Sequence, residues 1–88
     1  MLEFFECQRS VRIFGLRVVI YFNDHRPAHA HVVGKDCEAV FAMDCVRNTM
    51  LLTENYGFKR KEIARMRPML MEALPALCAA WKEIHADF

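Results

Sequence analysis

The sequence has 88 residues, which is enough for a single domain over residues 1–88 and leaves little room for a second. Its 55% content of hydrophobic residues excludes a disordered chain, while no apolar run approaches the roughly 20 residues of a membrane-spanning helix. Twelve Lys and Arg against eleven Asp and Glu give a formal charge of +1, which excludes a globally basic nucleic-acid binder.

The first predicted element covers residues 11–22, VRIFGLRVVIYF, where β-branched and aromatic residues favour a strand. Gly15 interrupts the segment, so it forms either one strand or two short strands bent at the glycine. The residues NDHRP at 23–27 are typical of a turn, because Asn and Asp tolerate turn geometry and proline disfavours helix at the residue before it.

Residues 28–33 and 37–43 are predicted to form a β-hairpin. A two-residue turn at Gly34-Lys35 would pair Val32 with Cys37 and His31 with Glu38. The period of two then gives an apolar face, which consists of Ala30, Val32, Cys37, Ala39, Phe41 and Met43, and a second face with His29, His31, Glu38 and Val40.

Residues 44–48 are expected to connect the hairpin to a short further strand at 49–53. From about residue 58 the apolar residues recur every three or four positions, which predicts amphipathic helix up to about residue 86. This stripe consists of Ile63, Met66, Leu70, Leu74, Leu77, Trp81, Ile84 and Phe88. Pro68 and Pro75 predict a kink or break between 67 and 75, with Pro75 as the candidate first residue of a second helix. The expected fold is α+β: three to four antiparallel strands over about 11–53, with C-terminal helices packed on one face of the sheet.

The four cysteines, Cys7, Cys37, Cys45 and Cys78, match neither a CxxC pair nor paired zinc knuckles, and we expect them to be reduced thiols that pack in the core. The first seven residues are acidic and do not resemble a signal peptide, so a cytoplasmic location is expected.

Three of the four histidines lie within residues 25–31, and this concentration is the main functional signal. His29 and His31 are two apart on a predicted strand, so their Cα atoms would lie about 6–7 Å apart on one face, near enough to share a metal ion. His25 would complete a three-histidine site for zinc or another divalent transition metal that activates water, with Asp24 or Glu38 as a fourth ligand or an orienting acceptor.

Two other interpretations of the same residues remain open. His25, His29 and His31 could act as acid and base without a metal, as in RNA cleavage, with Arg26, Arg17 or Lys35 binding phosphate. Alternatively the histidines are structural or bind a partner, and His31 only forms a hydrogen bond with Glu38. His85, near the end of the predicted helix, is left out of the site.

The densest charge lies at residues 59–67, KRKEIARMR. Its basic residues, Lys59, Arg60, Lys61, Arg65 and Arg67, either contact nucleic acid or an acidic partner, or form the solvated face of the helix.

The segment GLRVVIYFNDHRPAHAHV at 15–32 resembles the hallmark of a bacterial family known only as domain of unknown function number four thousand one hundred and sixty. Its NDHxPxHxHV pattern is matched by Asn23, Asp24, His25, Pro27, His29, His31 and Val32, and the segments CEAVF, ENYGF and LCAAWKEIH follow in the right order. The chain departs from the pattern at Ala30, where a larger apolar residue is usual, and at 46–49, which replaces a turn rich in Gly and Pro.

The resemblance implies no activity, but it implies a partner, because members are typically encoded beside another small protein in arrangements that look like toxin–antitoxin pairs. Two functions are therefore expected. One is a small cytoplasmic interaction protein of such a pair, which binds its partner through the histidine-bearing sheet face and the basic helix. A homodimer is also compatible with so small a core. The alternative is a metal-dependent or histidine-dependent hydrolase or nuclease with His25, His29 and His31 at its site.

Overall fold

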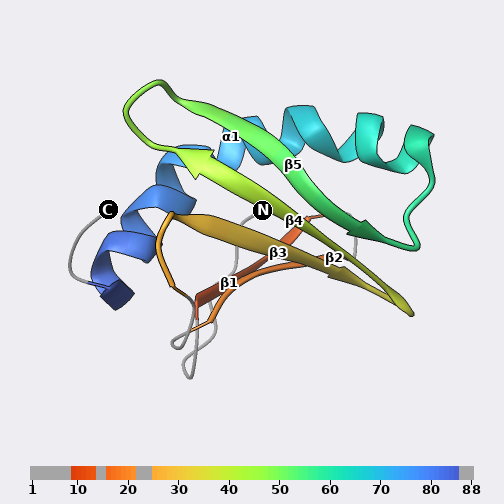
Figure 1. The fold of residues 1–88 in the computed structure, drawn as a ribbon, viewed down its shortest axis with the longest axis horizontal. Helices are drawn as coiled ribbons and strands as arrows, with labels where there is room; N and C mark the ends of the chain where they lie inside the picture. The colour runs from red at the N-terminus through yellow and green to blue at the C-terminus, as the bar shows by residue number, and fades with distance from the viewer. Residues whose placement is uncertain (1–8, 14–15, 22–24, 86–88) are drawn as a thin grey trace.

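The computed structural model describes residues 9–13, 16–21 and 25–85 of the chain. Five antiparallel strands lie in the sheet in the order in which they occur in the sequence, and one long helix follows them. The elements are β1 (Arg9–Ile13), β2 (Leu16–Ile20), β3 (His29–Gly34), β4 (Cys37–Asp44), β5 (Thr49–Tyr56) and α1 (Arg60–His85) (Figure 1). The predicted α+β fold, with helix packed against an antiparallel sheet, is confirmed. No helix among the described residues is long and apolar enough to cross a membrane.

The sheet has one strand more than the three to four expected, because the segment around Gly15 contributes two strands. β1 and β2 pair antiparallel with Ile13 opposite Leu16, which is the second of the two alternatives left open for this segment. On its other side β2 pairs with β3, with Val19 opposite His31. The histidine-bearing strand is therefore the central strand of the sheet.

The β3–β4 hairpin turns one residue later than predicted. Gly34 pairs with Cys37, and the turn consists of Lys35 and Asp36, with Asp36 at a φ of 60°. A Cβ atom on Gly34 would lie 2.9 Å from the Cys37 Sγ, so close packing, and not the turn, requires the glycine. The predicted register is therefore wrong.

The two faces of the hairpin are nevertheless as predicted, because the error moves each residue's partner by two positions. The apolar residues Ala30, Val32, Ala39, Phe41 and Met43 are buried, and together with α1 they form the core. The opposite side of β3, β4 and β5, which we call the outer face, carries His29, His31, Glu38, Val40, Ala42, Leu51, Glu54 and Tyr56. Most of α1 packs on the opposite, apolar face, although Trp81 near its C-terminal end contacts His29.

The predicted strand at 49–53 is confirmed as β5 and extends three residues further, to Tyr56. Asp44 stabilises the turn between β4 and β5, because its Oδ1 accepts hydrogen bonds from the backbone N–H groups of Val46 (3.1 Å) and Arg47 (2.9 Å). Asn48 in the same turn has a φ of 62°. Asx bonding and a left-handed Asn can thus replace a turn built on Gly and Pro. A bulge between Val40 and Phe41 shifts the β4–β5 register.

Residues 60–85 form one continuous helix, so the predicted break and second helix starting at Pro75 are wrong. Proline removes the hydrogen bond to the carbonyl four residues earlier, and for Pro68 and Pro75 these carbonyls belong to Ala64 and Met71, which are exposed and can be hydrated. The apolar stripe is buried on both sides of the prolines, and this packing outweighs the lost bonds. The helix curves along its length in Figure 1.

Cys45 and Cys78 form a disulfide, with their Cα atoms 5.9 Å apart, so the prediction of reduced thiols is wrong for this pair. The pairing joins the β4–β5 turn to the last third of α1, and a separation of 33 residues in sequence gives no sign of it. Cys37 is a free, partly buried thiol, and Cys7 lies outside the described residues.

Candidate functional site

The structure places two of the three predicted site histidines side by side. His29 and His31 project from β3 onto the outer face, with their ring centroids 5.2 Å apart. His25 and Arg26 are exposed in the segment before β3, which contains the cis peptide bond between Arg26 and Pro27. Asp24 lies outside the described residues.

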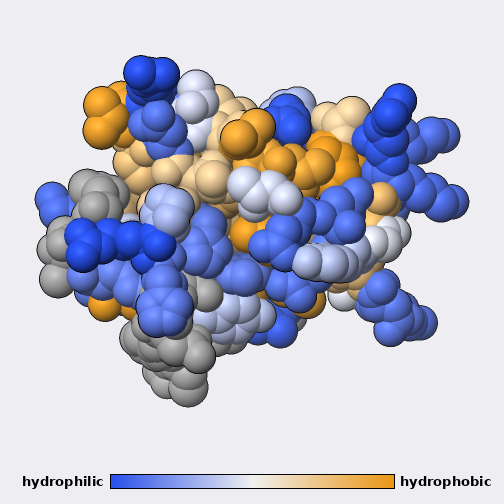
Figure 2. Space-filling model, in the orientation of Figure 1, coloured by the Kyte–Doolittle hydropathy of each residue, from blue (hydrophilic) through white to orange (hydrophobic). Residues whose placement is uncertain are grey.

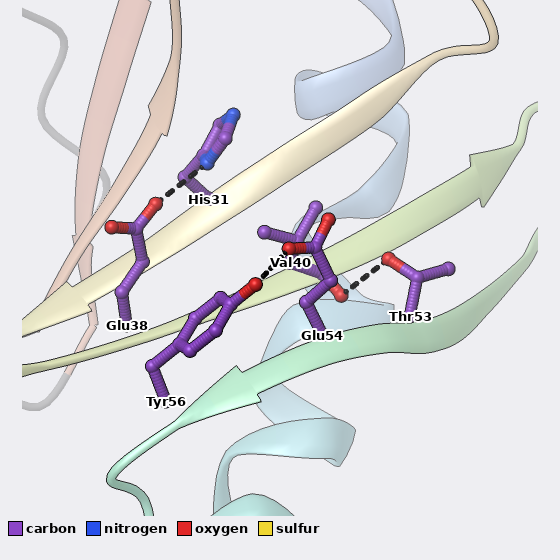
Figure 3. A network of polar contacts seen from close by, with 6 residues as sticks. All are labelled: His31, Glu38, Val40, Thr53, Glu54 and Tyr56. Atoms are coloured by element: carbon purple, nitrogen blue, oxygen red, sulfur yellow. Dashed lines mark hydrogen bonds and ion pairs between the residues drawn. The ribbon is translucent and has the colours of Figure 1, made fainter.

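His31 is oriented by a carboxylate on the neighbouring strand. Its Nδ1 lies 2.8 Å from Glu38 Oε2 (Figure 3), so one of the predicted alternatives, the His31–Glu38 hydrogen bond, is confirmed. The two residues are diagonal neighbours, since Val40 is the residue directly opposite His31. The ionised carboxylate can only accept, so the imidazole donates from Nδ1, which fixes the orientation of a ring whose side chain is only 16% exposed.

His29 is oriented by the backbone. Its Nδ1 lies 2.8 Å from the carbonyl oxygen of Pro27, and because a carbonyl only accepts, Nδ1 carries the proton. Its ring also lies 5.4 Å from that of the buried Trp81 on α1. Both outer-face histidines are thus held in defined orientations through Nδ1.

A shallow groove of about 200 Å³ lies beside the histidines. It is lined by Pro27, His29, His31, Val40, Ala42, Thr53 and Glu54. The lining combines apolar side chains of β4 with polar groups of β3 and β5, so the groove can take an apolar group next to hydrogen-bonding or charged ones.

A second polar pair lies on β5, across Val40 from His31 (Figure 3). The hydroxyl of Tyr56 donates a hydrogen bond to Glu54 Oε1. That hydrogen bond raises the pKa of Tyr56 above its usual value, and the charge of Glu54, a small loss of hydration and the charge of Glu38 act in the same direction. The outer face at β4 and β5 is therefore locally negative.

The comparison with known proteins identifies the family. The family described as domain of unknown function (DUF4160) matches residues 15–82. The chain belongs to the DUF4160 family. No curated protein and no solved structure matches it. The matched residues include the whole outer face of β3, β4 and β5 and most of α1, so the groove and both polar pairs belong to the part of the chain that the DUF4160 family shares.

The three histidines of the DUF4160 signature are not grouped in space. Among the described residues, no three His, Cys, Asp or Glu side chains lie close enough together to hold a metal ion. His29 and His31 could supply two ligands through Nε2, since Nδ1 of each is engaged. The zinc site with His25 as third ligand stays a prediction.

The predicted basic residues separate into two groups. Lys59, which precedes α1, and Arg60, Lys61 and Arg65 on α1 are exposed. Arg67 instead has a structural position: its Nη1 donates to the carbonyl oxygen of Met50 (3.3 Å) and its guanidinium lies 5.6 Å from the centre of the Phe41 ring. Arg17, a predicted phosphate ligand, is half-buried on β2 opposite Val33, at the opposite end of β3 from His29.

Several residues near the histidines were not predicted to belong to the site, among them Glu54, Tyr56, Trp81 and His85. Glu54 and Tyr56 were missed because the predicted strand ended at residue 53, and continued alternation would have placed them on β5. Trp81 was assigned to the core and His85 was left out, yet their rings lie 4.0 Å apart and Trp81 contacts His29. The spacing of four residues on a helix indicated the contact between Trp81 and His85. Nothing in the sequence indicated that Trp81 would contact His29 on the sheet.

Proposed function

We propose that this protein is the interaction component of a toxin–antitoxin-like pair and that it binds a protein partner on its outer face. Most of α1 covers the opposite face, and the outer face combines oriented polar groups with the accessible apolar side chains of Leu51 and Tyr56. This combination is typical of the surfaces through which proteins bind one another. The resemblance to a family encoded beside a second small protein supports such a partner.

The position of the exposed hydrophobic residues carries the proposal. Four large hydrophobic side chains are exposed among the described residues, and three of them, Val46 (93%), Leu51 (66%) and Tyr56 (59%), lie between residues 46 and 56. Leu51 and Tyr56 belong to the outer face, and Val46 lies in the turn at its end. Figure 2 shows hydrophobic surface in this region with hydrophilic residues around it. Clustered exposed apolar surface marks interaction sites.

The experiment measures binding to the product of the gene next to its own by isothermal titration calorimetry. We expect the double substitution His29→Asn and His31→Asn, and separately Leu51→Ser, to weaken binding by about tenfold or more, as the loss of central interface groups does. Glu72→Gln, on the exposed side of α1, is the matched control and should bind like the wild type. Unchanged affinity in both outer-face variants would refute the proposed surface.

A second candidate function, a hydrolase or nuclease, is favoured by one observation. His31 donates to Glu38 while its ring borders the groove, which is the arrangement that orients a general base. His29 beside it could act as the acid, or both could hold a divalent metal such as zinc.

Metal content and toxicity separate this candidate from the first. Protein purified without a histidine tag is analysed for zinc, nickel, manganese and iron, and its thermal unfolding is followed with each metal added. The hydrolase predicts bound metal, or toxicity on expression that the His29→Asn, His31→Asn double variant abolishes. Metal-free protein whose expression is harmless would contradict it.

A further inference from the structure

β5 is an edge strand of the sheet. Among the described strands, β5 pairs only with β4, so the backbone groups on its other edge have no strand partner there. An edge strand of eight residues with exposed hydrophobic side chains is a template for another strand. The accessible part of this edge and the charge beside it determine which strand could pair with it.

The second half of β5 is accessible. Residues 53–56 are all exposed, including Asn55, whose side chain belongs to the face that α1 covers elsewhere. The first half is partly occupied, because Arg67 donates to the outward carbonyl of Met50. The free edge therefore runs from Leu52 to Tyr56.

The charge beside this edge is negative. Glu54 and Tyr56 project from β5 onto the outer face, and Glu38 lies opposite Tyr56 on β4. The raised pKa of Tyr56 reports the negative charge of both glutamates. A strand added at this edge would place its own outer-facing side chains next to Leu51, Glu54 and Tyr56.

We infer that the partner adds a β-strand to the Leu52–Tyr56 edge and presents a Lys or Arg opposite Glu54, with apolar residues two positions to either side. This inference rests on the proposed function and specifies how the partner is held. The basic residue would pair with Glu54. The apolar residues would pack on Tyr56 and on Leu51, which lies two register positions from Glu54 because the bulge leaves Thr53 as an extra residue. Backbone hydrogen bonds supply affinity in such strand addition, and alternate side chains supply specificity.

A second copy of this chain fits the edge less well. In a symmetric antiparallel pairing of two β5 strands centred between Thr53 and Asn55, each Glu54 lies opposite the other Glu54 or within two residues of it. Like charges in these positions are destabilising. A pairing centred on Leu51 would have to displace Arg67 from Met50 in both copies.

The first test uses a designed peptide as the probe, acetylated and amidated, with the sequence Val-Thr-Lys-Thr-Val. We expect it to shift the backbone amide signals of residues 52–56 in the NMR spectrum of the labelled protein. A matched peptide with Glu in place of Lys should bind more weakly, and Glu54→Lys should reverse the preference, each by about threefold to tenfold. Equal responses to the two peptides, shifts confined to other strands, or a concentration-dependent dimer that protects β5 would overturn the inference.

The second test removes one backbone donor. The Met50 carbonyl points away from β4, so by the period of two the Leu52 N–H does as well. Chemical synthesis with ligation at Cys45 allows N-methylation of Leu52 without a change of side chain. We expect the Lys peptide to lose its effect on residues 52–56, while the unfolding midpoint stays close to that of the unmodified synthetic protein. Retained peptide binding by the folded, N-methylated protein would overturn the inference.

The same variant separates this inference from the proposed function. If the neighbouring gene product loses affinity for the His29→Asn, His31→Asn variant but binds N-methyl-Leu52 protein normally, the outer face binds the partner and strand addition is refuted. If that product does not bind at all while the Lys peptide does, the proposed pair is refuted and the strand site stands.

Discussion

His31 shows how neighbouring side chains orient one ring on a central strand. The ring is flanked by Tyr21, whose centroid lies 4.9 Å away, and by His29 at 5.2 Å, and its Nδ1 is bound to Glu38. Diagonal neighbours on antiparallel strands lie about 7–8 Å apart, a distance that the long side chain of Glu can bridge. Edge-to-face ring contacts and hydrogen bonding together hold the ring in one orientation, as an interface or an acid–base group requires.

The hydrogen bond between Tyr56 and Glu54 can be tested through the pKa of Tyr56. Its pKa is raised mainly by the hydrogen bond to Glu54, so Glu54→Gln should lower it toward the usual value of 10.0. A tyrosine whose pKa is raised by folding contributes stability that is fully present below its unfolded pKa and lost as pH rises through its folded pKa. We therefore expect alkaline unfolding of the wild type to be more sensitive to pH above 10 than that of the variant.

The measurement is ultraviolet titration of tyrosinate in a Tyr21→Phe background, which leaves Tyr56 as the only tyrosine. Glu38→Gln serves as the graded comparison, because the charge of Glu38 is the smallest of the causes and its removal should move the pKa less. An unchanged titration in the Glu54→Gln variant would show that this hydrogen bond does not form in solution.

Sequence alone predicted the outer-face positions of His29, His31 and Glu38, because these follow from the period of two along a strand. It did not predict that His25 would be exposed and apart from them, since the path of a turn depends on tertiary packing. Nor did it predict that Arg67 would bind Met50, because a basic residue in a helical stripe is indistinguishable from its solvated neighbours until the facing strand is known.

At the scale of elements, the faces were predictable where the register was not. Hydrophobic alternation fixes which residues are buried but is satisfied by any register that differs by two, so it could not place the β3–β4 turn. For α1 the wrong prediction came from giving a local signal, the two prolines, more weight than packing. Their local penalty, about 3 kcal/mol for proline in a helix interior, suggested a break, while packing on the sheet keeps one helix continuous.

The hairpin register can be tested with two substitutions. Gly34→Ala should lower the free energy of unfolding by about 1–3 kcal/mol, because its Cβ would lie 2.9 Å from Cys37 Sγ and 3.0 Å from Leu16 Cδ2. Asp36→Gly should leave stability unchanged or raise it by about 0.5 kcal/mol, because residue 36 has a positive φ. Urea unfolding of both variants tests the register, and Asp36→Gly decides it. A turn at Gly34-Lys35 would also require glycine at position 34, but it would make Asp36 a paired strand residue, where glycine is destabilising.

For the whole molecule, the disulfide adds a covalent link to a fold whose core is small. One covalent link joins the β4–β5 turn to α1, so the end of the outer face and the core helix are fixed to each other. Cys45 also lines a second groove, of about 680 Å³, with Arg26, Pro27, Ala28, Met43, Asp44 and Val46. The expected cytoplasmic location would place this link in a reducing compartment, where it would open. Stability and the shape of the surface near Val46 would then depend on the redox state.

The contribution of the link can be measured directly. A disulfide that closes a loop of 33 residues is expected to stabilise the fold by about 3.5 kcal/mol through the entropy of the unfolded chain. Urea unfolding of the oxidised protein should therefore show a midpoint well above that of the Cys45→Ala, Cys78→Ala double variant. Adding reductant should lower the midpoint of the wild type but not that of the variant. Cys37→Ala is the control, because this thiol is free, and it should keep the response to reductant. If the oxidised and reduced wild type unfold at the same urea concentration, the link contributes no stability, and packing of α1 on the sheet alone maintains the fold.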